Sequence, residues 1–427
     1  MNRFLLLLTV FVILLCTSSC QLTHNDITNL PIDIVSPDFE YIEIDDKPYD
    51  YNYVVGANQL QYSDGYLYCY DSIISDKNKT LKKIDIKTGI VTSVCSDPIC
   101  LHNSPECPIF GIANAFFVHN NNVFFKRLYT YRYRNTDGSI RNTAEVSDSV
   151  CFNIDKSKLT VLESYESQSI LDYTEQLFVD NYRYYYDYIY NETEDKHLFK
   201  ICRLNIDTGE ISAIGEENRV DEILYRFLFS LNERIYFTDG KRLFSRSLDN
   251  TDEQLHCYGS FGDKVLTDGT GVYFDLSNNG LTDVYYMSNL NDYNSAKLII
   301  KGCSSWELTE NYIYFIDGEQ RVIGNSAVSG YQGQDIVLRG KNIFRCSHSG
   351  DNIESVFTFE NEFKNHKLTN IVVVDNYIYG LYNYWTDSDG DGVLQDDDVY
   401  YSSEKEHFNI MRIDATNGTV HYLTLNQ

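Results

Sequence analysis

A short aromatic strand motif that recurs along the chain is the feature that most restricts its fold. Residues 311–318 (Asn-Tyr-Ile-Tyr-Phe-Ile-Asp-Gly) alternate large apolar side chains with residues that tolerate the opposite face, and they stop at Asp-Gly. Period-two alternation ended by a turn dipeptide predicts a β-strand that enters a hairpin. Similar segments occur at residues 65–71, 122–125, 182–186, 234–239, 271–275 and 376–380.

A second motif follows several of these strands. Residues 84–89, 206–209 and 413–418 place Asp with Thr or Asn and Gly between apolar, alternating residues, and residues 154–157 and 248–250 are looser copies. Turn chemistry of this kind predicts an outer hairpin. The two motifs repeat at spacings of roughly 40–60 residues, which is typical of a β-propeller. We count seven copies and therefore expect an all-β fold, a single β-propeller of seven four-stranded blades. Six or eight blades also fit the spacing.

The N-terminal residues have the layout of an export signal. Residues 1–3 form a short basic region, residues 4–16 form an apolar run that is short for a transmembrane helix, and Thr-Ser-Ser-Cys follows at 17–20. These last four residues resemble the lipobox of bacterial lipoproteins. The resemblance implies cleavage before Cys20 and attachment of diacylglycerol to Cys20. An ordinary signal peptide on a secreted protein is the alternative.

We therefore expect three parts in the chain. Residues 1–19 are a lipoprotein signal peptide, residues 20–51 are a lipidated, acidic and proline-containing tether, and residues 52–427 are the β-propeller. Residues 38–44 in the tether also alternate, so they would be able to pair with the last blade and close the ring. The expected location is extracytoplasmic, with the chain lipid-anchored to the bacterial cell membrane.

The charge of the chain argues against nucleic acid as a partner. The formal net charge is −27, and no basic stripe offsets a field that repels phosphate. Motifs of the common nucleophilic, nucleotide-binding and metallopeptidase enzymes are also missing from the sequence. We expect a monomer that is not an enzyme.

A cluster of cysteines and one histidine is the most specific local pattern. Cys95, Cys100, His102 and Cys107 lie within thirteen residues, and three thiolates with an imidazole suit a closed, tetrahedral structural zinc site. A disulfide with a spare thiol, or residues without any ligand, remain alternatives for this loop. The spacing Cys-x-Asp-Pro-x-Cys-x-His resembles that of β-propeller lipoproteins of Gram-positive (Firmicutes-type) bacteria. That resemblance brings no established activity with it. Cys69, Cys151 and Cys202 lie in predicted strands, where we expect small buried apolar residues.

An acidic segment of the last blade predicts a calcium site. Asp387, Asp389 and Asp391 occupy the first, third and fifth positions of an EF-hand-like loop. Val393 would supply a carbonyl at the seventh position and Asp398 the final carboxylate, with Asp396 or Asp397 as rivals for that role. The alternative is a solvated acidic hairpin tip.

These features favour a non-catalytic binding or scaffold propeller for a glycan, peptide or protein ligand. The rival hypothesis is a carbohydrate-active enzyme with acidic residues in the propeller channel. The aromatic run at residues 182–190 fits either a platform for sugar rings or, more simply, packing between blades.

Overall fold

Thirty short strands and a single turn of 3-10 helix make up the described part of the computed structural model. The structure describes residues 46, 53–54, 60–70, 81–97, 100, 107–109, 112–131, 144–166, 176–191, 196–219, 226–248, 252–325, 334–340, 342–359, 366–385 and 406–424. Across these residues, no helix has the length and apolar character that crossing a membrane requires.

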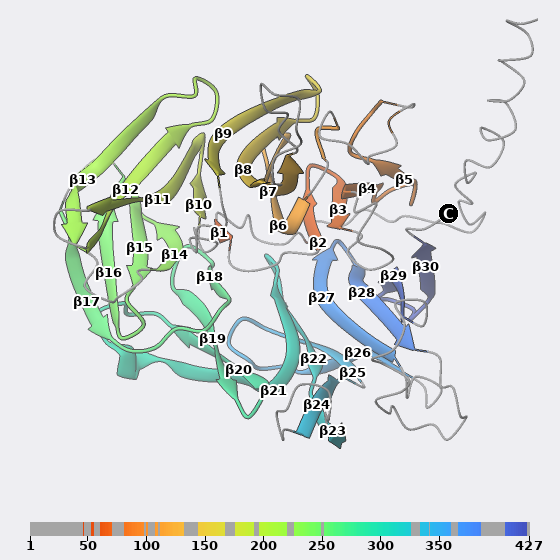
Figure 1. Cartoon of the computed structure of the whole chain (residues 1–427). Coiled ribbons are helices and arrows are strands. Elements are labelled where there is room, and N and C mark those ends of the chain that lie inside the picture. Colours follow the sequence, from red (N-terminus) through yellow and green to blue (C-terminus); the bar gives the residue numbers. More distant parts are fainter. Residues whose placement is uncertain are drawn as a thin grey trace, which may run out of the picture.

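The strands form antiparallel sheets arranged around a common centre (Figure 1). Blades 1 and 2 contain β2 (Leu60–Ser63), β3 (Tyr66–Tyr70), β4 (Leu81–Asp85), β5 (Val91–Ser93), β6 (Ile112–His119), β7 (Asn122–Tyr131), β8 (Ala144–Asn153) and β9 (Lys158–Glu166). Blades 3 and 4 contain β10 (Gln176–Val179), β11 (Tyr182–Asn191), β12 (Lys196–Asn205), β13 (Ile211–Arg219), β14 (Arg226–Leu231), β15 (Arg234–Thr238), β16 (Arg242–Ser247) and β17 (Gln254–Tyr258).

Blades 5 and 6 share one strand. Their strands are β18 (Val265–Thr267), β19 (Val272–Asn278), β20 (Leu281–Met287), β21 (Lys297–Leu308), β22 (Ile313–Asp317), β25 (Asn342–Cys346) and β26 (Glu354–Thr358). The first part of β21 pairs with β20, and the second part pairs with β22. Helix η1 (Tyr293–Ser295) precedes β21. The long strand is therefore the outermost strand of blade 5 and the innermost strand of blade 6.

Blade 7 completes the ring with β27 (His366–Val374), β28 (Tyr377–Trp385), β29 (Glu406–Asp414) and β30 (Val420–Thr424). With β21 counted in both of its blades, the described strands form seven four-stranded units, which confirms the predicted blade number. The first strands of neighbouring blades approach one another around the centre, including β2 with β6, β10 with β14, and β2 with β27. The first strand of each blade is thus the innermost one.

One predicted hairpin is wrong in detail. The sequence predicts that β22 turns back at Asp317-Gly318 into its partner, but β22 pairs with β25, which begins at Asn342. A separate hairpin of β23 (Glu319–Asn325) and β24 (Gln334–Arg339) is inserted between them. The Asp-Gly turn signal marks the strand end correctly, but it does not fix which later strand becomes the partner.

The two sequence motifs recur together because their turns lie at the same end of each blade. In five blades one main-chain hydrogen bond of 2.7–3.2 Å joins the turns, from the N–H of Ile86, Ile154, Ile206, Leu248 or Ala415 to the carbonyl of Gly65, Asn121, Asn181, Glu233 or Asn376, respectively. We call the end of the ring that carries these paired turns the turn face. Several of these turns need positive φ angles, such as the φ of 50° at Asp64 and 83° at Gly65, which Asp, Asn and Gly tolerate best.

Apolar packing between blades holds the ring together. Each junction between neighbouring blades has its own buried cluster, and the junction of blade 7 with blade 1 joins Val374, Tyr377 and Tyr379 to Leu67 and Cys69. The four described strands of blade 7 are consecutive in sequence. Residues 38–44, which would be able to extend that blade, lie outside the described residues. Among the described residues, the ring therefore closes through side-chain packing.

Two described pieces of the N-terminal region also contact the ring. Strand β1 (Tyr53–Val54) pairs antiparallel with Leu177 and Gln176 of β10 on the inner side of blade 3 (Figure 1). Asp46 is buried against blades 6 and 7.

Candidate metal centre

The cysteine loop connects the outermost strand of blade 1 to the innermost strand of blade 2, and buried neighbours fix both of its ends. The N–H of Val94 continues the strand ladder by donating to the carbonyl of Leu81 at 3.0 Å. Val94 and Ile109 are both buried in the junction of the two blades. Cys95 and Cys107 lie beside these two anchors, so packing sets the positions from which their sulfur atoms project.

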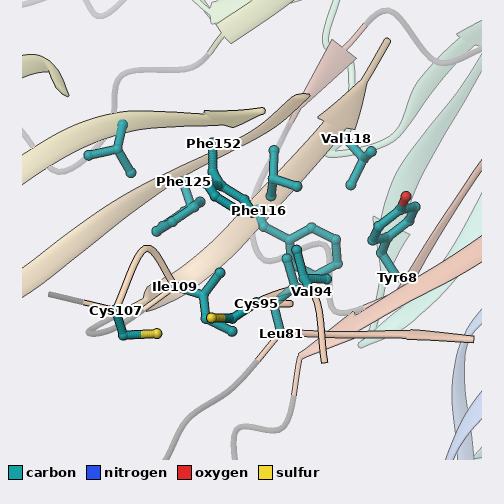
Figure 2. Packing of buried hydrophobic residues seen from close by; sticks show 12 residues of the cluster. Tyr68, Leu81, Val94, Cys95, Cys107, Ile109, Phe116, Val118, Phe125 and Phe152 are labelled. Atoms are coloured by element: carbon teal, nitrogen blue, oxygen red, sulfur yellow. The ribbon is translucent and has the colours of Figure 1, made fainter. Parts of the chain in front are cut away.

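The three cysteines of the loop converge. The Sγ atoms of Cys95, Cys100 and Cys107 all lie within 4.8 Å of one another. Figure 2 shows the sulfur atoms of Cys95 and Cys107 directed toward each other at the edge of the apolar cluster. With Zn–S bonds of about 2.3 Å, tetrahedral geometry requires sulfur atoms about 3.8 Å apart. Sulfur atoms that all lie within 4.8 Å of one another are compatible with this geometry.

Without a bound cation, the surroundings of the sulfur atoms favour neutral thiols. Burial raises the pKa of the Cys95 and Cys107 thiols, and the neighbouring sulfur of Cys100 raises both further. The main-chain N–H groups of Asp97 and Ile109 donate to these sulfur atoms and act in the opposite direction, lowering the pKa of Cys95 and Cys107 respectively. Donors of this kind stabilise anionic sulfur, and a divalent cation would relieve the repulsion among the thiolates.

The loop also contacts the outer part of blade 2. The hydroxyls of Ser96 and Ser157 lie 3.1 Å apart, and Ser157 belongs to the turn between β8 and β9. Cys100 packs against the same buried cluster as Ile154 and Leu159 of blade 2. An ion held by the three sulfur atoms would therefore tie the end of blade 1 to blade 2.

His102, the predicted fourth ligand, lies outside the described residues, so its role stays a prediction. The competing disulfide is not formed in this structure, since no disulfide joins the nine cysteines that the structure describes.

Cys69, Cys151 and Cys202 are buried in β3, β8 and β12, which confirms their prediction as small apolar core residues.

The predicted calcium ligands Asp387, Asp389, Asp391, Val393 and Asp398 also lie outside the described residues. The strands on either side of them are described: β28 pairs with β29 as far as Trp385 and Glu406. The acidic segment therefore connects two paired strands of the last blade, as expected.

Cys20, the predicted lipidation site, lies outside the described residues as well.

The aromatic run at residues 182–190 forms most of β11. Tyr184 and Tyr185 are buried, and Tyr184 belongs to the apolar cluster between blades 3 and 4. The guanidinium of Arg203 lies over the ring of Tyr182, 4.9 Å from its centroid. For these three tyrosines the structure supports packing within and between blades and not a sugar platform.

One arrangement of two side chains of blade 4 and one of blade 5 was not predicted from the sequence. Ser245 Oγ lies 2.7 Å from His256 Nε2, and His256 Nδ1 lies 2.9 Å from Asn291 Oδ1, an order of contacts like that of a nucleophile, a base and an orienting group. However, Ser245 is 0% exposed, and Arg234 Nε donates to the same hydroxyl at 2.7 Å. A substrate does not reach this oxygen, so the arrangement stabilises the sheet.

Comparisons with known proteins add only distant likenesses. No protein-family model matches the chain, and no curated protein does. Among solved structures, one of prolyl endopeptidases matches 87% of this chain and 50% of its own, at 11% identity and a TM-score of 0.49. An acylaminoacyl peptidase of Pyrococcus horikoshii matches 87% of this chain and 52% of its own, at 8% identity and a TM-score of 0.47. The chain spans about half the length of these peptidase chains.

A third solved structure is a separate propeller domain. The β-propeller domain of the Trilobed protease from Pyrococcus furiosus matches 87% of this chain and 97% of its own, at 9% identity and a TM-score of 0.43. Likenesses this distant transfer no peptidase activity to the present chain.

Proposed function

We propose that this chain is a non-catalytic binding or scaffold propeller that is lipid-anchored at Cys20 on the outer side of a bacterial cell membrane. The proposal rests mainly on one observation. The chain's own strand β1 pairs with β10, the innermost strand of blade 3. A carbohydrate-active enzyme would need free carboxylates facing a substrate in that channel.

The partners of two buried acids support this proposal. Asp283 accepts hydrogen bonds from the N–H of Gly302 at 2.8 Å and from Asn278 Nδ2 at 2.9 Å. Glu307 is paired with Lys264 at 2.6 Å. Each of these carboxylates is engaged in contacts that hold strands together, which leaves it poorly suited to act as a general acid or base.

A structural zinc ion belongs to the same proposal. Cys95, Cys100 and Cys107 would hold it, with His102 as the fourth ligand. Four protein ligands leave no open position for a substrate or an activated water, so the ion would stabilise the junction of blades 1 and 2 and take no part in chemistry.

A cleavage assay tests the non-catalytic part of the proposal. The purified chain is incubated with pectin, xylan and mixed-linkage glucan, and new reducing ends are measured against heat-denatured protein. We expect no release. Reducing ends that form at the same rate in independent preparations would reject the proposal in favour of the glycan-cleaving enzyme.

Cell fractionation tests the anchor. The wild-type chain should sediment with membranes and carry diacylglycerol, whereas Cys20→Ala should accumulate as precursor without lipid. If the wild-type protein is instead found in the culture medium with an N-terminus other than Cys20, the chain is secreted and the anchor is wrong.

A further inference from the structure

Asp46 is held like a ligand by residues that lie far away in the sequence. It is 3% exposed, and its Oδ1 accepts hydrogen bonds from both the N–H and the Nδ2 of Asn311, each at 3.2 Å. Its Oδ2 faces the hydroxyl of Tyr314 at 3.5 Å, and the side chain of Thr309 donates to the carboxylate too. Blade 6 therefore supplies a set of donors that matches one carboxylate.

The main chain of the same residue is bound by the next blade. The N–H of Asp375, in the turn between β27 and β28, donates to the carbonyl of Asp46 at 2.5 Å. Asn311 likewise lies in the turn between β21 and β22. Asp46 thus lies on the turn face, where these two blades meet.

Seven residues later, the chain is bound on another side of the ring. Tyr53 and Val54 pair with Leu177 and Gln176 of β10, and β1 also lies beside β14 of blade 4. Blades 3 and 4 lie across the ring from blades 6 and 7 (Figure 1). Asp46 and Tyr53, seven residues apart in the chain, are therefore bound by opposite sides of the ring.

These contacts combine two modes by which proteins bind extended peptides. Strand addition at β10 binds the main chain of the peptide. The hydrogen-bond donors of blade 6 bind one acidic side chain. Strand β1 has only two residues, so its ladder alone holds it weakly. Its covalent connection to the ring gives the segment a high effective concentration, which compensates for a small contact area.

We propose that the inner side of the ring, from Asn311 on the turn face to the first residues of β10, is a binding site for an extended acidic peptide, and that the chain's own Asp46 and Tyr53–Val54 occupy it in cis. This inference rests on the proposed binding function and specifies its ligand class. A free carboxylate ligand fits less well, since it would fill the donor set of blade 6 but leave the edge of β10 unpaired. Release of the N-terminal segment would make both parts of the site available to a peptide from another chain.

The test uses the full chain with residues 55–59 replaced by a site-specific protease sequence. The folded protein is cut, the released N-terminal fragment is separated by gel filtration, and a fluorescent peptide with the sequence of residues 43–54 is titrated by anisotropy. We expect saturable binding to the cut protein and none to the uncut protein.

Two matched peptides and one ring variant test the specificity. The peptide with Asp46→Ala should bind at least tenfold more weakly than the peptide with Asp45→Ala, although both have the same net charge. Asn311→Ala in the cut ring should weaken the unmodified peptide to a similar extent. Equal affinity of the two altered peptides would show that only net charge is recognised, and the proposal would fail.

Two further outcomes would also overturn the proposal. If the cut protein loses its cooperative thermal transition, the N-terminal segment is part of the core and not a displaceable ligand. If the cut protein stays folded and binds no peptide, the site has no affinity outside its covalent context. Neither outcome changes the expected results of the cleavage and fractionation assays, so failure of this inference is separable from failure of the proposed function.

Discussion

Asn311 donates its main-chain N–H to the carboxylate of Asp46, a residue that lies 265 positions earlier in the chain. The contact joins the N-terminal region to the turn between β21 and β22. Asp46→Ala would remove the hydrogen bonds that the buried carboxylate of Asp46 accepts from Asn311, at a cost of about 1–2 kcal/mol in the free energy of unfolding. Asp46→Asn keeps one acceptor and should cost less. Urea unfolding at neutral pH measures both, and equal stability of the wild type and Asp46→Ala would contradict the role of this contact.

The same residue predicts a pH dependence. Burial raises the pKa of Asp46 above its ordinary value, although hydrogen bonds from Thr309, Asn311 and Tyr314 partly oppose this shift. A raised folded-state pKa means that the folded state binds the proton more tightly than the unfolded state. The stabilisation is therefore complete below the unfolded pKa and is lost as the pH rises through the folded pKa. Relative to Asp46→Asn, the wild type should lose stability as the pH rises above the unfolded-state pKa of about 3.9, as unfolding curves at several pH values would show.

Removal of zinc should weaken the junction of blades 1 and 2. We expect about one zinc ion per chain by metal analysis, and a lower melting temperature after treatment with a strong chelator. Cys100→Ser should abolish zinc binding, whereas Cys257→Ser should not, because Cys257 is a buried cysteine of β17 that is no part of the cluster. Full zinc content in Cys100→Ser, or a disulfide among Cys95, Cys100 and Cys107 in the purified protein, would rule out this centre.

Calcium at residues 387–398 should stabilise the last blade locally. At a hundredfold excess over Kd, a ligand that binds only the folded state contributes about 2.7 kcal/mol. We expect EGTA to lower the melting temperature and to increase proteolysis between Trp385 and Asp398, while far-UV circular dichroism changes little. Asp389→Ala combined with Asp391→Ala should remove the response. Identical melting and cleavage in calcium and in EGTA would indicate a solvated acidic turn.

The ion pair between Lys264 and Glu307 links blades 5 and 6. Glu307 is 2% exposed, and Lys264 Nζ also donates to the carbonyl of Trp306 at 2.6 Å. Glu307→Ala should cost about 2 kcal/mol, less than a fully buried pair, because the side chain of Lys264 is 32% exposed. Asp263→Ala is the matched control: it breaks an ion pair with Arg226 in which Asp263 is 93% exposed, so its effect should stay below about 1 kcal/mol. Equal losses in the two variants would contradict the distinction.

The blade repeat was predictable because its signals are local. Alternating aromatic strands and positive-φ turns such as Asp64-Gly65 are decided by neighbouring residues. The insertion of β23 and β24 after Asp317 was not predictable in the same way, since it depends on which of two later strands pairs with β22.

The candidate sites also differ in how far they could be predicted from local sequence. Convergence of Cys95, Cys100 and Cys107 could be predicted because the three residues lie within one short loop. The binding of Asp46 by Asn311 and Asp375 has no sequence signal, because nothing near Asp46 indicates where a distant turn will place its N–H groups.

The strand that blades 5 and 6 share limits how the gene for this protein can be rearranged. Gly302, with a φ of 69°, and Cys303 lie where β21 leaves β20 and joins β22. A circular permutation that opened the chain there would divide a strand, whereas residues 259–264, between β17 and β18, offer a break outside any strand. Deletion of blade 5 or blade 6 together with β21 would likewise take one strand from the remaining blade, so a deletion that keeps four-stranded blades has to remove both.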